Sequence, residues 1–417
     1  MSFAGFVALG LLAACGSRPG AFAPDDGGEP PYMDATTDAT PSDGSSGDGP
    51  SLQLSADGSH GPSGCATCSA DLHQVLDCTT QQVLGTCGSD AGCGASGQCI
   101  EPCAAAAANG SSVGCEYYAV NPDAYSDTPD EPVAGASLGG SCFAAFVANT
   151  WTSPVTLHVD LAGQSLDLSK SLFVPKGTGP SLSYTPVTNA SIAPGQVAIV
   201  FLADLASAGA TFPDVVHCPA GVTAAYVTAD AAIHGTGTGH AFHLTTTAPV
   251  VAADIYPYGG AVGFVTSATL LLPTSVWDTN YVAVAAYAGE NDPYPVAGGP
   301  THTYDSNVTF VASEDGTTVT LRPSVAVAGG GGVAAADAGA QVKYTLGKGE
   351  SLQLEQLGDL SGSVVQSDKP IGVWGGHWCE YIPVGPPSAD SCDGAHQQIP
   401  PVKALGSEYV AVRYRER

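Results

Sequence analysis

The sequence is poor in basic residues and contains no long apolar run. Its 417 residues include 11 Lys and Arg against 39 Asp and Glu, a formal net charge of −28. Nucleic-acid binding relies on Lys and Arg to replace phosphate counterions, so this balance argues against nucleic acid as a partner. A membrane-spanning helix needs about 20 apolar residues, and no stretch of the sequence supplies them.

Charged residues of either sign are also few, at 12%, whereas apolar residues make up 44% of the chain. An apolar content of this size supplies a real core and excludes disorder of the whole chain. Gly and Pro are abundant, with 53 and 31 copies. The length suits two or three modules rather than one small domain.

The first residues resemble an export signal. Residues 3–14 are apolar or small and are followed by Cys15, a pattern typical of the apolar region of a secretory signal. The segment Leu-Ala-Ala-Cys at 12–15 resembles a bacterial lipobox, in which the cysteine is acylated and becomes the mature N-terminus. No Lys or Arg precedes Arg18, so either the true start lies upstream or the signal is atypical. We expect residues 1–15 to be a lipoprotein signal and Cys15 to anchor the chain at the bacterial outer membrane or cell surface; a plain secreted protein is the alternative.

Removing Cys15 leaves twelve of the 13 cysteines, an even number. In an exported chain such cysteines indicate a disulfide framework. A zinc site at the CxxC of residues 65–68 is the alternative, but no second CxxC or Cys/His pair at zinc-finger spacing accompanies it. The expected disulfide cysteines are Cys65, Cys68, Cys78, Cys87, Cys93, Cys99, Cys103, Cys115, Cys142, Cys218, Cys379 and Cys392.

Composition divides the rest of the chain into three parts. Residues 16–64 are rich in Gly, Ser, Asp and Pro and predict a disordered tether, because they cannot bury enough surface to offset their ordering entropy. Residues 65–114 predict a small cysteine-rich module that depends on its disulfides. The alanines at 104–108 within it predict one short helix. Residues 115–417 form the third part.

The third part predicts an all-β fold. Short runs rich in Val, Thr, Ala, Phe and Tyr alternate with Gly, Pro, Asn and Asp, and no helical period persists. We expect a floppy loop at the glycine run 329–332. Strands are expected at 143–148, 155–159, 197–202, 308–312, 317–321, 351–354 and 409–414.

An internal repeat organises this β region. Phe-Val-Ala at 146–148, six residues, and then Val-Thr-Leu at 155–157 recur with the same spacing at 310–312 and 319–321. Ala-Pro-Val at 248–250 corresponds to Lys-Pro-Ile at 369–371, and Tyr-Val-Ala-Val occurs at both 281–284 and 409–412. The sequence therefore predicts two copies of one β unit, near 140–290 and 300–417, built as sandwiches or propeller-like blades. We expect the chain to be truncated and a further copy to follow it.

One segment carries a resemblance to a known family. The residues are S-D-K-P-I-G-V-W-G-G-H-W-C at 367–379, Cys-Asp at 392–393 and Q-Q-I-P-P-V at 397–402. In pattern, order and spacing they resemble the N-terminal domain of the IgGFc-binding protein family, over about 115–417. The lipobox, tether and cysteine-rich module are similar to those of bacterial cell-surface members. The resemblance implies an exported binding or adhesion module; it does not imply antibody binding and supplies no catalytic residue.

Five residues near the C-terminal end mix metal-ligand and nucleophile types: His377, Cys379, Cys392, Asp393 and His396. A disulfide between the two cysteines would close a short loop and stabilise the fold by about 3 kcal/mol. Oxidised sulfur is neither a nucleophile nor a thiolate ligand. We therefore favour a structural bridge here and assign neither a metal nor catalysis.

Three histidines surround a glycine-rich segment: His234, His240 and His243. They could hold zinc or copper on a flexible loop. On one extended strand, however, His240 and His243 would point to opposite faces. Solvated loop histidines are the interpretation we favour.

Acidic residues cluster twice, and dispersed solvating charge is the favoured interpretation of both clusters. Calcium, which takes six to eight oxygen ligands, is the alternative, although no EF-hand spacing is present. We assign no cofactor. The clusters are Asp123, Asp127, Asp130 and Glu131, and Glu290, Asp292 and Asp305.

Two enzyme-like patterns are explained by their context. Residues 135–139 fit G-x-S-x-G, but a loop rich in Pro and Asp precedes them, where a nucleophile elbow requires a strand. Residues 92–97 fit G-x-G-x-x-G inside the cysteine-rich module, where no βαβ unit could form.

Tryptophans such as Trp277 could stack on sugar rings, although packing in the core is the interpretation we favour. Trp374, His377 and Trp378 are the candidate binding residues.

Together these patterns predict a lipid-anchored surface protein that binds an extracellular protein or glycan, touches the membrane only through its lipid, and is not an enzyme. The alternatives are an extracellular hydrolase of polysaccharide or peptide, and a structural surface-layer component. A hydrolase would present a pocket with paired acids or a nucleophile activated by histidine. A structural component would present edge strands that pair with each other.

Overall fold

The structure is a computed structural model. The expected signal segment, the expected tether and Cys15 lie outside the residues it describes. All described residues lie within one compact unit, Pro62–Arg417. They are residues 65–126, 136–208, 215–260, 266–291, 303–380 and 392–410.

The cysteine-rich module is small and held by disulfides. A three-stranded antiparallel sheet is followed by a two-stranded one and a short helix. Three disulfides join its strands and loops, Cys65–Cys78, Cys68–Cys93 and Cys87–Cys99. Its elements are β1 (Ala66–Cys68), β2 (Gln74–Asp77), β3 (Val83–Thr86), β4 (Gly92–Cys93), β5 (Cys99–Ile100) and α1 (Pro102–Asn109).

Helix α1 confirms the helix predicted from the alanine run and extends it at both ends. The Glu101 side chain accepts hydrogen bonds from the backbone N–H groups of Cys103 and Ala104, and Pro102 occupies the first turn, where its missing N–H costs nothing. Gly110 ends the helix at φ 58°, in the left-handed region that glycine tolerates. A fourth disulfide, Cys103–Cys115, ties this helix to the first strand of the β region.

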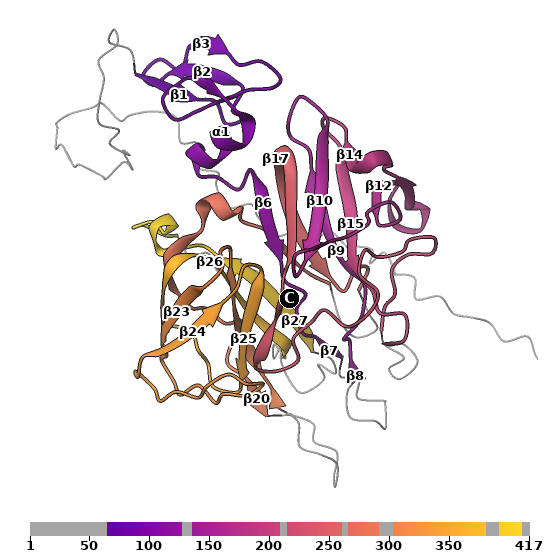
Figure 1. Ribbon diagram of the computed structural model, residues 1–417, viewed down its shortest axis with the longest axis vertical. Helices are drawn as coiled ribbons and strands as arrows, with labels where there is room; N and C mark the ends of the chain where they lie inside the picture. The colour runs from indigo at the N-terminus through magenta and orange to yellow at the C-terminus, as the bar shows by residue number, and fades with distance from the viewer. Residues whose placement is uncertain are drawn as a thin grey trace, which may run out of the picture. The chain divides into compact units, whose positions relative to one another are not determined.

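The predicted all-β class is confirmed: the rest of the described chain forms two curled sheets (Figure 1). The first sheet has ten strands and runs β11-β10-β17-β9-β15-β12-β13, with β14 on β10 and with β6 and β18 on β17. Its strands are β6 (Gly114–Ala119), β9 (Phe143–Ala148), β10 (Val155–Leu161), β11 (Gln164–Ser165), β12 (Leu172–Lys176), β13 (Ser183–Pro186), β14 (Ser191–Ile192), β15 (Val197–Ala203), β17 (Phe242–Tyr256) and β18 (Ser267–Leu270).

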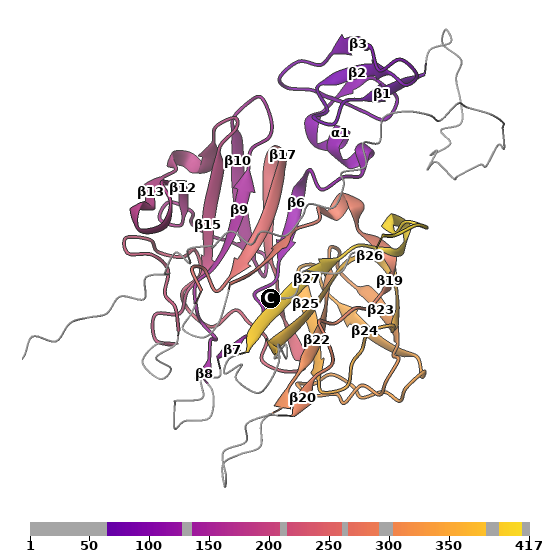
Figure 2. The same cartoon turned by 180° about the vertical axis from the view of Figure 1, so that it is seen from behind.

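The second sheet has eight strands and runs β16-β25-β22-β26-β23-β24, with β19 and β27 also paired to β26, as the reverse view shows (Figure 2). Its strands are β16 (Gly237–His240), β19 (Asp278–Val282), β22 (Ser306–Ala312), β23 (Thr317–Arg322), β24 (Val342–Leu346), β25 (Glu350–Gln356), β26 (Val364–Glu380) and β27 (Asp393–Ile399). The short pairs are β7 (Tyr125–Ser126) with β8 (Ala136–Ser137) and β20 (Glu290–Asn291) with β21 (Thr303–Tyr304). The 3₁₀ turns are Gly179–Ser181, Thr188–Ala190, Thr274–Val276 and Val402–Ala404.

One long strand organises each sheet. The first half of β17 pairs with β10 and β6, and its second half pairs with β9 and β18. In the same way β26 pairs first with β23 and β19, then with β22 and β27. Pro249 and Pro370 lie where the partners change. Proline has no N–H for a ladder, so it is tolerated at this point in a long strand.

The two sheets repeat the same plan, but the repeat begins earlier than the sequence matches indicate. Strand β6, which begins the segment Tyr-Tyr-Ala-Val at 117–120, and strand β19, which begins Tyr-Val-Ala-Val at 281–284, pair with the long strands β17 and β26. Each therefore opens a unit rather than closing one. We call β6 to β18, apart from β16, the first β unit; β19 to β27, together with β16, form the second β unit.

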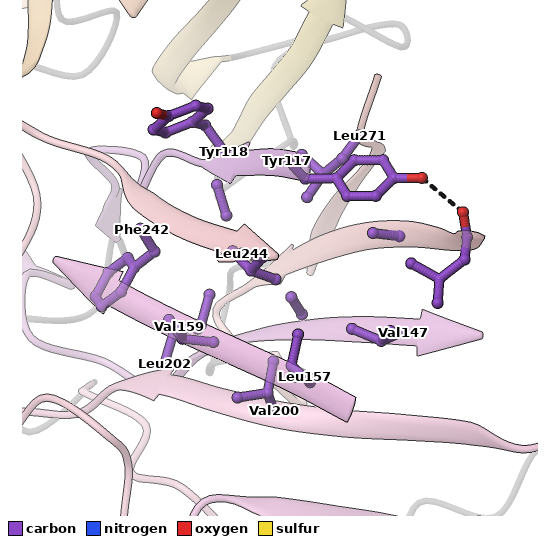
Figure 3. Close-up of a cluster of buried hydrophobic side chains, with 14 of the residues drawn as sticks. Tyr117, Tyr118, Val147, Leu157, Val159, Val200, Leu202, Phe242, Leu244 and Leu271 are labelled. Carbon is purple, nitrogen blue, oxygen red and sulfur yellow. Dashed lines mark hydrogen bonds between the residues drawn. The ribbon is translucent and has the colours of Figure 1, made fainter. Parts of the chain in front are cut away.

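Each β unit has an apolar core, and Val311 and Trp374 of the second unit join the core of the first. The core of the first unit gathers Val147, Leu157, Val200 and Phe242 from four strands, all buried (Figure 3). The core of the second unit gathers equivalent strand residues such as Phe310 and Leu321. Cys142–Cys218 closes a long stretch of the first unit, and Cys379–Cys392 joins the end of β26 to the start of β27.

Two local expectations need correction. The glycine run 329–332 is ordered, since Gly330 and Val333 exchange backbone hydrogen bonds, and a Cβ on Gly331 would lie 2.3 Å from the carbonyl oxygen of Thr236. The run packs against a neighbouring segment, so it is not a floppy loop. Tyr409 and Val410 form no strand and are exposed; the rest of the expected strand lies outside the described residues.

Candidate functional site

Two adjoining pockets hollow the surface beside β10 and β16. Their volumes are about 560 and 640 Å³, and they share Ala162 and His240. We call them together the histidine groove, because His158, His240 and His243 line one pocket and His234 and His240 line the other. The groove is bordered by both β units, since Asp315, Lys348 and Gly349 of the second unit complete the first pocket.

At the base of the first pocket, His243 is held between two carboxylates. It lies opposite Asp160 in the β10–β17 ladder, and its Nδ1 atom is 2.8 Å from the Asp160 carboxylate. Its Nε2 atom is 2.8 Å from Glu116 on β6. Burial lowers the pKa of His243, but the bonds to Glu116 and Asp160 outweigh it and the net shift is upward. The pKa of Glu116 falls, mainly through the same bond, so the arrangement favours an imidazolium ion.

Tyr118 lies flat against this imidazole. The two ring centroids are 4.6 Å apart and the ring planes differ by 19°. The tyrosine is fully buried, and its hydroxyl makes no hydrogen bond with the described residues. Tyr117 and Tyr118 are neighbours on β6, so their side chains leave the strand on opposite faces; both belong to the buried cluster of Figure 3, and Tyr118 also lines the first pocket. Burial, and next the carboxylate of Glu116, raise the pKa of Tyr118, so its hydroxyl stays protonated.

His234 forms a second charged centre in the other pocket. Its Nδ1 atom is 2.8 Å from Asp123 and its Nε2 atom is 3.0 Å from Asp230. These two hydrogen bonds raise the pKa of His234 to about 10, so the ring is charged at neutral pH. Beyond it lies Glu355, whose pKa is raised to about 9, first by burial and then by Asp123.

The groove corrects our expectation for the three histidines. His240 ends β16 and His243 lies in β17, with Ala241 between the two strands, so they do not share one continuous strand. Both reach the same pocket instead of opposite faces. Within the described part of the chain, no three His, Cys, Asp or Glu side chains converge as metal ligands.

The sequence interpretation missed Glu116, Tyr118, His158, Asp160 and Lys348. A signal for two of them was available. Thr156, His158 and Asp160 alternate with buried apolar residues along β10, which places the histidine and the aspartate on the outward face. No local signal marks Glu116 or Lys348, because the fold brings them to His243 and to the first pocket from distant parts of the sequence.

The three candidate binding residues lie elsewhere. Trp374 and His377 are buried at 3% and 1% exposure, so neither side chain is available to a partner in this structure. Burial lowers the pKa of His377 to about 4, which leaves its ring neutral. Trp378 packs beside the Cys379–Cys392 disulfide.

The acidic clusters are only partly described, because Asp127, Asp130, Glu131 and Asp292 lie outside the described residues. So does the start of the G-x-S-x-G pattern.

The disulfides predicted from the sequence are present. All twelve expected cysteines are paired, in six bonds. Such a framework indicates folding in an oxidising compartment outside the cytosol. No helix among the described residues is long and apolar enough to cross a membrane. The structure thus defines a disulfide-bonded, all-β protein with two units of one plan.

Comparison with known proteins finds one family model, which matches a segment that includes β18 and the strands from β19 to β27. Residues 267–417 match the family model described as IgGFc binding protein. The resemblance inferred from the sequence is therefore confirmed over these residues. No curated protein and no solved structure matches the chain.

Proposed function

We propose that this protein is a lipid-anchored surface protein that binds an extracellular protein or glycan through the histidine groove. The match of residues 267–417 to a family described as a binding protein supports a binding function. Anchoring through Cys15 at the outer surface of a bacterium rests on the lipobox-like segment. The residues from 16 to 64 would then hold the folded part away from the membrane.

We place the binding site in the groove because charged and polar side chains are concentrated there on ordered strands. His243 and Asp160 lie on paired strands, and Glu116 comes from the strand on the other side of β17. Lys348 adds a half-exposed positive charge, its Nζ atom 3.9 Å from Glu116. Polar groups on strands lose little entropy when a ligand binds, because they are already ordered.

An array of glycans and extracellular-matrix proteins tests this proposal. The probe is the chain with Cys15→Ser, which removes the lipid attachment and leaves the folded part unchanged. The expected result is binding to at least one class of ligand. Lys348→Ala and His240→Ala should each weaken that binding at least fivefold, because both side chains border the groove.

Lys343→Ala is the matched control. Lys343 is an exposed lysine on β24 that lines neither pocket, so its removal changes the net charge equally without altering the groove. Equal loss of binding in Lys343→Ala and Lys348→Ala would contradict a site in the groove. A silent array would contradict the proposed binding function.

A further inference from the structure

Away from the histidine groove, three side chains from three strands form one hydrogen-bonded chain. Asp254 lies on β17, Ser267 begins β18 and His396 lies on β27. The Nε2 atom of His396 is 2.6 Å from Oδ1 of Asp254, and its Nδ1 atom is 2.9 Å from Oγ of Ser267. The order is hydroxyl, imidazole, carboxylate.

The strands around this chain hold it in place. The backbone N–H of Gln398 donates to Oγ1 of Thr269 over 3.1 Å, and the N–H of Leu272 donates to the Gln398 side chain over 2.6 Å. These bonds fix β27 beside β18. The imidazole and the serine therefore sit on fixed strands, which is the requirement for a positioned catalytic group.

The three hydrogen-bonded side chains are buried to different degrees, least at the serine and most at the aspartate. Asp254 is fully buried and His396 is 8% exposed, whereas Ser267 is half-buried and its neighbour Ala268 is exposed. An acyl group arriving from solvent would therefore meet the hydroxyl first. The acid lies behind the imidazole, where solvent does not compete for its hydrogen bond.

The hydrogen-bond pattern matches that of an activated serine. With the ring proton on Nε2 and donated to the Asp254 carboxylate, the lone pair of Nδ1 faces the Ser267 hydroxyl. Burial opposes this ionised form, because it raises the pKa of Asp254. The backbone N–H of His396 also donates to the Ser267 oxygen, over 3.2 Å. That donor stabilises negative charge developing on the oxygen while Nδ1 takes its proton. A nucleophile beside a base that is oriented by a third group is the general form of such sites.

We propose that Ser267 is the nucleophile of an acyl-transfer site that acts on carboxylic esters or peptide bonds, with His396 as general base and Asp254 as the residue that positions it. The Ser267 oxygen bonds to the carbonyl carbon, and its proton passes to Nδ1 of His396. The bond from that carbon to the leaving alcohol or amine breaks, and the leaving group takes the proton from Nδ1. Water then bonds to the same carbon and loses a proton to Nδ1. The bond from that carbon to the Ser267 oxygen breaks, the oxygen takes the proton from Nδ1, and the acid leaves.

A fluorophosphonate tests this activity directly, because it bonds to activated serines with loss of fluoride. The intact folded chain, with its six disulfides verified by non-reducing mass mapping, is treated with the probe and the modified residue is located by mass spectrometry. We expect modification at Ser267, and none after Ser267→Ala. Ser313 is the internal control: it is half-buried, and its hydroxyl donates to the carbonyl oxygen of Pro370 and not to an imidazole.

Variants separate catalysis from structure. His396→Gln should lower the modification rate roughly 10³-fold or more, as loss of a triad base does. Asp254→Asn should lower the maximal rate while the half-saturating probe concentration stays unchanged, a result that a merely structural role would not give. Absence of modification at Ser267 in the folded wild-type chain overturns the proposal, and so does a rate unaffected by His396→Gln. Because the groove variants leave Ser267 untouched, failure of the binding proposal is distinguishable from failure of this one.

Discussion

Tyr117 and Tyr281 occupy the same position in the two β units. Tyr117 donates its hydroxyl hydrogen to the carbonyl oxygen of Val250 over 2.6 Å, which Figure 3 shows as a dashed line. Tyr281 donates to the carbonyl oxygen of Ile371, also over 2.6 Å. Each acceptor directly follows the proline of a long strand, so the tyrosine satisfies a buried carbonyl where the ladder changes partners.

We expect Tyr281→Phe to lower the free energy of unfolding by about 1–3 kcal/mol, because it leaves the buried Ile371 carbonyl without its donor. Chemical denaturation at neutral pH measures the change. Tyr287→Phe is the control, since that side chain is 66% exposed, and it should have little effect. Equal effects of the two substitutions would refute the proposed role of the tyrosine.

We expect His234 to stay protonated through neutral pH and to titrate near pH 10. A raised histidine pKa contributes stability that is complete below about 6.5 and is lost as the pH rises through the folded value. Asp230→Asn should lower the pKa of His234, measured by NMR of the ring carbons. Asp160→Asn contacts His243 instead and should leave the His234 titration unchanged.

Glu355 predicts a second pH effect. Burial and Asp123 raise its pKa to about 9, so the folded state holds a proton that the unfolded state releases above about pH 4.5. Stability should therefore fall between about pH 4.5 and 9, by at most about 1.4 kcal/mol per pH unit from this group. Glu355→Gln should remove that dependence and be more stable than wild type at pH 8, measured by thermal unfolding. A difference that is equal at pH 4 and pH 8 would contradict the protonated acid.

The disulfides should differ in how much each contributes to the free energy of unfolding. Cys142–Cys218 spans 76 residues of sequence and Cys87–Cys99 spans 12. In the chain-entropy model the longer loop contributes about 4.5 kcal/mol and the shorter one about 3 kcal/mol. Paired Cys→Ser substitutions followed by denaturation measure both values; a larger loss for the short loop would contradict the entropic account.

Cys15→Ser should release the chain from membranes, because it removes the expected site of acylation. Metabolic labelling with a fatty acid and fractionation of the cells measure this. Labelling that persists in the variant would refute the anchor.

Much of the fold could be predicted from the sequence because short-range rules govern it. The alternation of Val155-Thr156-Leu157 predicted β10, and the alanine run predicted α1. The predicted start of each unit was wrong, because Tyr281 and its neighbours follow the preceding residues in the sequence without a marked boundary. Only their pairing with β26 shows which unit they join.

The candidate sites were less predictable. Asp254 and His396 are 142 positions apart in the sequence, and Glu116 and His243 are 127 positions apart. The spacing of these residues in the sequence therefore does not indicate that either pair is in contact. Trp374 and His377 attracted attention because their residue types are common in sites. The structure places both in the interior, since they lie in the half of β26 that is paired on both edges, with β22 and β27.

The Cys103–Cys115 bridge has a mechanical consequence. A force applied from the N-terminal side passes from Cys103 through the disulfide to Cys115, so residues 104–114 bear no load. Helix α1 is thereby spared, and the load enters β6, whose hydrogen bonds to β17 would have to break before the first unit opens.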